Sequence, residues 1–113
     1  MNKVVYNACF GGFSISKAAT EWLAENGREE IKAIAKKKLQ KHPDGNFYNI
    51  CYEIQRHDPD LVRCVETLGH AANGEYANLQ VRELKGNRYR IEDVYYGNEV
   101  VFEPEDEEYI TIE

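Results

Sequence analysis

The sequence predicts a single α+β domain in which about three helices pack on one face of a mostly antiparallel sheet. Three observations lead to this expectation. The first two thirds of the chain combine short strand patterns with apolar residues at helical spacing. The last third changes to apolar residues at every second position, interrupted by turn residues, which indicates hairpins. The length of 113 residues suffices for one hydrophobic core and not for a second.

The expected elements follow one another along the chain. Residues 3–8 form an apolar strand pattern, and residues 16–27 have the apolar spacing of a helix. Serine can cap the start of that helix, and its Asn-Gly end tolerates the left-handed backbone of a helix stop. A second helix is expected over 29–40, with lysines on its outer face. Alternating aromatic and β-branched residues predict a strand over 47–54. Asp-Pro at the start and glycine at the end indicate a third helix over 58–69.

The C-terminal part reads as a β-meander. Strands are expected around 79–84, 89–91 and 100–102, with turns at Gly86-Asn87 and Gly97-Asn98. Residues Tyr109-Ile110-Thr111-Ile112 can pair as a last strand. The whole chain, 1–113, is thus expected to be one domain that ends in an acidic segment at about 99–113.

The composition excludes several classes of protein. With 42% hydrophobic and 12% aromatic residues, the chain is globular and not disordered. We expect no contact with a membrane, because no apolar run is long enough to span one and no signal peptide is present. Three widely spaced cysteines, Cys9, Cys51 and Cys64, favour reduced thiols and a cytoplasmic location. Because no close pair of metal ligands exists, we expect neither a metal nor a cofactor.

The charge is distributed unevenly along the chain. The net charge is −6, but residues 1–98 contain all 14 lysines and arginines and 13 of the 20 acids. The other seven acids lie between Glu99 and Glu113, where there is no base. Overall acidity disfavours direct binding to nucleic acid. An acidic end can instead bind a basic surface of a partner protein. Its candidate contacts are Glu103, Glu105, Asp106, Glu107 and Glu108.

The segment Asn7-Ala8-Cys9-Phe10-Gly11-Gly12-Phe13-Ser14-Ile15-Ser16 is a candidate anion site. A strand, a glycine loop and a helix start in this order can present backbone N–H groups to an anion. The segment matches neither the dinucleotide fingerprint nor the P-loop. The alternative is a tight connection between strand and helix, in which Phe10 and Phe13 pack inward.

Three ionisable residues, Arg56-His57-Asp58, stand directly before the third expected helix. Asp58 suits the helix cap. Arg56 and His57 either add to the anion site or form surface salt bridges. The predicted ligand site comprises Asn7, Gly11, Gly12, Ser14, Arg56, His57, Asn73 and Tyr95.

Aromatic residues and arginines alternate in the expected meander. Tyr89, Tyr95 and Tyr96 lie close in sequence to Arg82, Arg88 and Arg90. Such side chains can stack on a nucleotide ring, although cross-strand pairs of tyrosine and arginine are also common stabilising neighbours in hairpins.

Catalysis ranks last among the functions considered. A cysteine and histidine pair could provide a nucleophile and a base, but nothing in the spacing brings Cys9 to His57 or His70. No catalytic residue is therefore predicted.

Several segments together resemble a family of small proteins found largely in bacteriophages and other large DNA viruses. The matching segments are Val5–Ser16, Arg56–Val62, Ala72–Gly74, Ala77–Val81 and Tyr89–Gly97. The resemblance implies a viral origin and a bacterial host cytosol, and it implies no particular chemistry, since the family has no assigned function. Relatives often end in a short basic and aromatic tail, whereas this chain ends in acids, so the resemblance does not extend to its C-terminus.

Two functions follow as expectations. The first is a phage-type accessory or anti-defence protein that binds a small anionic ligand, such as a nucleotide or a nucleotide-derived signal. The alternative is an inhibitor that binds a host defence or nucleic-acid enzyme through its acidic C-terminal surface. The sequence leaves self-association into a homo-oligomer open.

Overall fold

The computed structural model describes residues 2–41 and 53–104. It confirms the α+β class, and the three expected helices are all present. The elements are β1 (Lys3–Asn7), α1 (Lys17–Asn26), α2 (Glu29–Lys41), α3 (Pro59–Leu68), a short 3-10 helix (Gly69–Ala72), β2 (Leu79–Glu83), β3 (Arg90–Tyr95) and β4 (Asn98–Phe102). Residues 47–52 and 109–112 of the two other expected strands lie outside the described part, as does Cys51. None of the described helices is long and apolar enough to cross a membrane.

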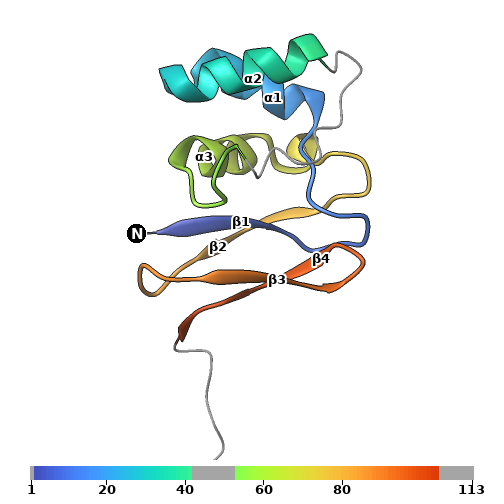
Figure 1. Cartoon of the computed structure of the whole chain (residues 1–113), viewed down its shortest axis with the longest axis vertical. Coiled ribbons are helices and arrows are strands. Elements are labelled where there is room, and N and C mark those ends of the chain that lie inside the picture. The colour runs from blue at the N-terminus through green and yellow to red at the C-terminus, as the bar shows by residue number, and fades with distance from the viewer. Residues whose placement is uncertain (1, 42–52, 105–113) are drawn as a thin grey trace, which may run out of the picture.

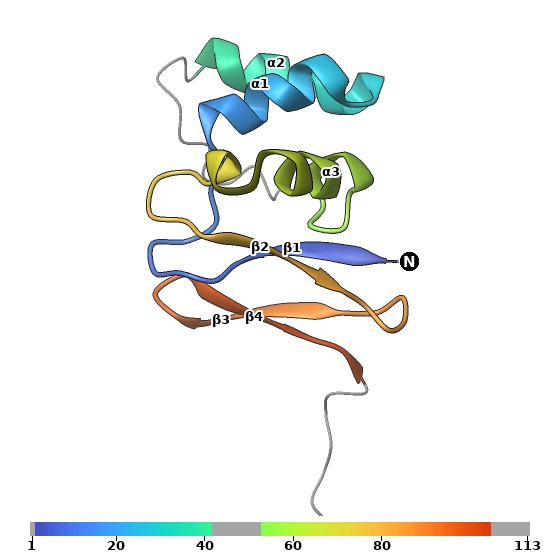
Figure 2. The same cartoon turned by 180° about the vertical axis from the view of Figure 1, so that it is seen from behind.

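The elements form stacked layers (Figure 1). Helices α1 and α2 form the outermost layer, α3 lies beneath them, β1 and β2 come next, and β3 and β4 form the last layer. The view from behind shows the same order, with all three helices on one side of the strands (Figure 2).

The described strands form two small sheets and not one continuous sheet. β1 pairs with β2 in antiparallel register from Lys3 opposite Glu83 to Asn7 opposite Leu79. β3 and β4 form a separate antiparallel hairpin. Of the expected meander, the structure therefore shows the β3–β4 hairpin. β2 does not pair with β3 but with β1, near the N-terminus.

The apolar residues of β1 explain this layered arrangement. Neighbouring side chains in a strand point to opposite faces. Val5 accordingly packs in the main core beneath the helices, whereas Val4 packs with Leu84 and Val101 against the hairpin. Because both faces of β1 are apolar, each face is covered by a different layer.

Local capping interactions confirm the helix starts that the sequence indicates. The Ser16 hydroxyl accepts the Ala19 N–H, and the Asp58 carboxylate accepts the Asp60 N–H at the first turn of α3. Gly27, at the end of α1, has φ −77° and therefore does not adopt the expected left-handed backbone. A Cβ atom there would lie 2.7 Å from the Leu23 carbonyl oxygen, so glycine is required by close packing instead.

An arginine joins the start of α2 to the start of α3. The backbone N–H and the Nε of Arg28 each donate to Asp60 Oδ2 over 2.9 Å, and the guanidinium also contacts Asp58. Burial alone would raise the pKa of Asp60, but the hydrogen bonds from Arg28 outweigh it, so that the pKa lies below its usual value.

The β3–β4 turn has Tyr96 and Gly97 at its centre. Both have positive φ, 43° and 91°, as in the type I′ turn that suits a two-residue hairpin loop. The carboxylate of Asp93 accepts the Gly97 N–H over 2.9 Å. The turn lies one residue before the Gly97-Asn98 position expected from the sequence.

The loop around Gly11 and Gly12, which we call the glycine loop, packs directly against this turn. The Gly11 N–H donates to the Tyr96 carbonyl over 2.7 Å. A Cβ atom on Gly97 would lie 2.2 Å from the backbone nitrogen of Gly12, whereas a Cβ atom on Gly12 would point into open space. Gly12 and Gly97 thus both adopt a positive φ, but of these two, close backbone packing requires glycine only at position 97.

We expect Gly97→Ala to lower the free energy of unfolding more than Gly12→Ala. Both glycines have φ +91°, so each alanine bears a similar left-handed strain of about 1–2 kcal/mol. Only Gly97→Ala adds a collision with the glycine loop. Urea denaturation of the two variants measures the difference, and an equal decrease in both would contradict the close packing of Gly97 on Gly12.

Candidate functional site

Arg56, the arginine of the predicted anion site, binds a carboxylate of the protein itself. The guanidinium of Arg56 forms two parallel bonds to Glu99 on β4, Nη1 to Oε1 over 2.7 Å and Nη2 to Oε2 over 2.9 Å. It also lies 3.7 Å above the ring of Phe13. The two charged side chains are only 13% and 11% exposed. Glu99 therefore makes the bidentate contact that we expected an external phosphate or carboxylate to make.

Asn7 joins the glycine loop, the β3–β4 turn and β4. Its side-chain amide donates to the carbonyls of Cys9 and Gly97, each over 2.8 Å, and its Oδ1 accepts the Asn78 N–H. Its backbone N–H donates to Glu99 Oε1. The polar atoms of this buried side chain are thus engaged in internal hydrogen bonds and hold the loops in place.

Ser14 and Asn73 also form internal bonds. The buried hydroxyl of Ser14 donates to the Glu75 carbonyl over 3.3 Å, and Asn73 Oδ1 accepts the Leu79 N–H over 2.8 Å. The backbone of Asn73 pairs with that of Ile15. These residues connect the segment before α1 to the segment before β2.

His57 lies apart from the glycine loop. Its Nδ1 is 2.7 Å from the hydroxyl of Tyr89, at the opposite end of β3 from the β3–β4 turn. Burial raises the pKa of Tyr89. The structure thus brings Arg56 and the backbone N–H of Asn7 to the same Glu99 carboxylate, whereas the neighbouring His57 contacts Tyr89.

The thiol of Cys64 is part of the core, as expected. It is fully buried in α3 and donates to the Ala19 carbonyl. Burial raises its pKa to about 12, so it stays protonated at neutral pH and is a poor nucleophile. Within residues 2–41 and 53–104, no group of three or more His, Cys, Asp or Glu side chains is placed to hold a metal ion.

Glu103 does not lie on an acidic surface. It is 1% exposed, and its carboxylate accepts the backbone N–H groups of Lys85 and Gly86 over 2.9 and 3.3 Å. Arg82 Nη2 lies 3.2 Å from the same carboxylate. The expectation that Glu103 contacts a partner is therefore corrected, because the β2–β3 turn and Arg82 use its charge. Glu105, Asp106, Glu107 and Glu108 lie outside the described residues.

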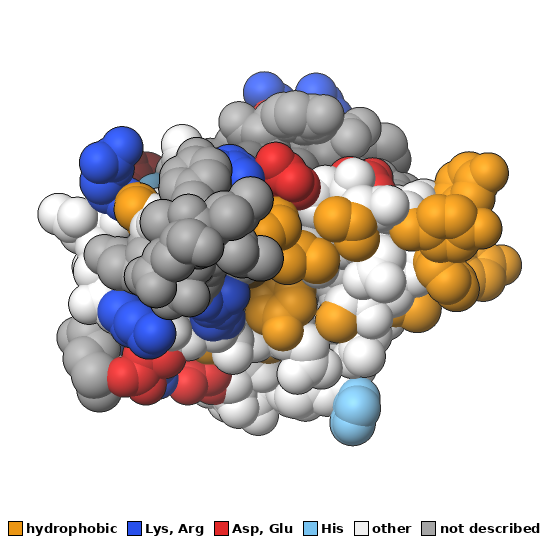
Figure 3. All heavy atoms as spheres, turned by 90° about the horizontal axis from the view of Figure 1, so that it is seen from below, with side chains coloured by type: hydrophobic (Ala, Val, Ile, Leu, Met, Phe, Trp, Pro, Cys, Tyr) orange, Lys and Arg blue, Asp and Glu red, His pale blue; other side chains and the backbone are white. Residues whose placement is uncertain are grey.

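Exposed aromatic rings gather where three loops meet. Tyr95, the ring predicted to stack on a ligand, has its centroid 5.2 Å from that of Phe10 and 4.5 Å from that of Tyr96. Tyr76 lies on the neighbouring loop, so close to Gly11 that a Cβ atom on this glycine would come within 2.5 Å of the Tyr76 Cβ. These four rings, which we call the aromatic cluster, are between 56% and 75% exposed. Seen from below, hydrophobic side chains project from this end of the molecule (Figure 3).

The sequence located this cluster only in part. Phe13 packs inward as expected, but Phe10 points to solvent, because the glycine loop turns between the two phenylalanines. Tyr76 carries no signal in the sequence. It becomes part of the cluster because its loop passes beside Gly11 in the folded chain.

The backbone of the aromatic cluster is strained. Tyr76 and Tyr96 have φ +62° and +43°, a conformation in which glycine and asparagine are the favoured residues. Such a residue costs about 1–3 kcal/mol and is found preferentially at functional sites. Large exposed rings at two strained positions, in contact with the same loop, make this the best candidate for a functional surface.

No protein-family model, curated protein or solved structure matches this chain. The resemblance to a family of phage proteins thus stays a prediction.

We expect the Arg56–Glu99 pair to be structural. Glu99→Leu leaves a buried guanidinium without its carboxylate and should lower the free energy of unfolding by about 3–5 kcal/mol. The double variant Arg56→Met/Glu99→Leu also removes the Asn7 hydrogen bond but leaves no uncompensated charge, so it should regain most of that stability.

Urea denaturation of the two variants and the unchanged protein tests this expectation. A decrease below about 1 kcal/mol in Glu99→Leu, as for an exposed ion pair, would contradict a structural role.

Proposed function

We propose that this chain is a phage-type accessory protein that acts by binding a host protein in the bacterial cytosol through the aromatic cluster. The observation that carries this proposal is the pair of exposed tyrosines, Tyr76 and Tyr96, at strained backbone positions. Asparagine or glycine at those two positions would make the folded protein more stable than tyrosine does. Because stability does not explain the two tyrosines, we attribute them to a function of their exposed rings.

A protein partner suits the cluster better than a small ligand does. The rings project from loop ends, whereas a small molecule is normally enclosed by a concave site. Tyrosine is enriched in protein interfaces, since it offers a large contact area and has little side-chain entropy to give up. The cluster contains no lysine or arginine to pair with phosphates, which disfavours single-stranded nucleic acid.

The internal contacts make the cluster a preorganised surface. Gly11 bonds to the carbonyl of Tyr96, and the rings of Phe10, Tyr95 and Tyr96 pack edge to face. Because the loops are already packed together, a partner need not order them, and the entropic cost of binding falls.

We expect the double variant Tyr76→Asn/Tyr96→Asn to abolish partner binding while it keeps its stability. Asparagine relieves about 1 kcal/mol of left-handed strain at each position. Against this gain, asparagine cannot pack edge to face on Tyr95 as the Tyr96 ring does. That packing is worth about 0.5 kcal/mol between exposed rings, the low end of the range for such pairs. The melting temperature should therefore stay the same or rise.

Affinity capture from a bacterial host lysate tests the binding, with the tagged full chain as bait. A protein retained by the unchanged chain should be at least tenfold depleted with the double variant, because two interface tyrosines together exceed about 1.4 kcal/mol. His70→Asn, at an exposed position on the 3-10 helix, is the matched control and should retain it. Equal retention by the double variant would contradict the proposal.

A charge variant distinguishes binding through the aromatic cluster from the alternative, binding through the acidic C-terminal segment. Replacement of Glu105, Asp106, Glu107 and Glu108 by their amides should slow association without abolishing capture, because charge outside the contact mainly steers encounter. Failure of this variant to capture the partner, with full retention by the tyrosine variant, would move the interface to the acidic C-terminal segment.

A further inference from the structure

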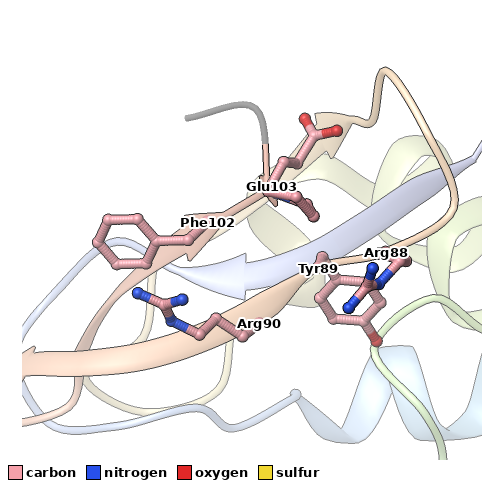
Figure 4. A pocket seen from close by; sticks show the side chains of 6 residues that line it. Arg88, Tyr89, Arg90, Phe102 and Glu103 are labelled. Carbon is pink, nitrogen blue, oxygen red and sulfur yellow. The ribbon is translucent and has the colours of Figure 1, made fainter. Parts of the chain in front are cut away.

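A hollow lined by two arginines lies at the opposite end of β3 from the aromatic cluster. It has a volume of about 230 Å³ (Figure 4) and is formed by Arg88, Tyr89, Arg90, Phe102, Glu103 and Pro104. A second hollow of about 140 Å³ shares Arg88 and Pro104 and extends to the Gly86-Asn87 turn. The two arginines come from the segment between β2 and β3 and from β3 itself.

Two contacts of Arg90 lie beside the hollow, one with Glu92 and one with Phe102. Its Nε is 3.1 Å from Glu92 Oε1, and its guanidinium lies 4.9 Å from the ring centroid of Phe102, its partner across the hairpin. Both members of the Arg90–Glu92 pair are about half exposed, so this one ion pair is weak and an anion can compete with Glu92 for the Nε of Arg90.

Arg88 makes no hydrogen bond or ion pair with another residue of the described ranges. It is exposed and lines both hollows. A guanidinium in this state keeps its full charge and all of its donors for a ligand.

The one carboxylate in the wall of the hollow does not cancel this charge. The oxygens of Glu103 accept the backbone N–H groups of Lys85 and Gly86 and the guanidinium of Arg82. In Figure 4 its carboxylate turns away from Arg90 and Phe102. Among the described residues, the wall of the hollow therefore contains two guanidinium groups and one carboxylate that already accepts internal hydrogen bonds.

We propose that this hollow binds the phosphate group of a small phosphomonoester. Guanidinium groups bind phosphate oxygens through paired N–H donors, and Arg88 and Arg90 present two such groups to one space. The volume is below the roughly 300 Å³ of a site for a drug-sized ligand, so it fits a phosphate and the part of the ligand next to it. This inference is independent of the protein-binding proposal, because it uses neither the residues nor the end of the molecule that carry the aromatic cluster.

Isothermal titration of the full chain at low ionic strength tests the site with three probes: inorganic phosphate, AMP and adenosine. Phosphate and AMP should bind, whereas adenosine should not. A higher affinity for AMP than for inorganic phosphate would identify a nucleoside phosphate as the better ligand, and equal affinities would identify phosphate alone, both in support of the site. Binding of adenosine as tight as that of AMP, or no heat with AMP at millimolar concentration, would overturn it.

Variants locate the binding in this hollow. Arg88→Gln should weaken AMP at least tenfold, and Arg88→Lys should weaken it less, because lysine keeps the charge but not the paired donors. Glu92→Gln should tighten AMP by removing the competing carboxylate. Arg63→Gln, on the exposed side of α3, is the matched control and should leave the affinity unchanged. An unchanged affinity in Arg88→Gln, with its fold verified by circular dichroism, would overturn the assignment.

Discussion

The buried ion pair between Arg56 and Glu99 holds the two halves of this fold together. Arg56 precedes α3, and Glu99 lies on β4, so the pair connects the helical layers to the hairpin. Within the described residues, the apolar cluster between the two strand layers consists of buried Val4, Leu84 and Val101, with Tyr6, Tyr89 and Ile91 partly buried against them. Apolar contacts are not directional and give little orientation. The fixed geometry of the paired guanidinium and carboxylate therefore sets how the hairpin sits on β1.

The position of the hairpin in turn places the candidate functional surface. Asn7 binds both Glu99 and the carbonyl of Gly97, so the ion pair and the β3–β4 turn share one anchor. The turn then packs on the glycine loop through Gly97, which brings Tyr95 and Tyr96 beside Phe10. Residues that the sequence indicated as an anion site thus act as the scaffold beneath a surface of aromatic rings.

Local patterns in the sequence were sufficient for the helices and their caps. The start of α1 at Ser16 and that of α3 at Asp58 depend on residues within one turn, so the sequence predicts both. The partner of Arg56 is 43 residues away, and no periodicity indicates which acid it meets. The reason for Gly27 differs from the left-handed backbone that the sequence predicts, because a Cβ there would collide with Leu23 and Ile31 where α1 meets α2. Tyr76 was missed because a tyrosine at positive φ opposes local preference, and only the folded loops show where its ring lies.

Amide hydrogen exchange at Asn7 in the full chain tests the docking of the hairpin most directly. Asn7 lies at the end of β1, and its N–H donates to the Glu99 carboxylate instead of a carbonyl of β2. If the ion pair fixes the hairpin on β1, this amide exchanges only on global unfolding, with protection close to that of the core of β1. Exchange at the rate of a solvent-exposed amide, while the amides of Val4 and Val5 stay protected, would show that the hairpin is not held by Glu99 and would contradict the account.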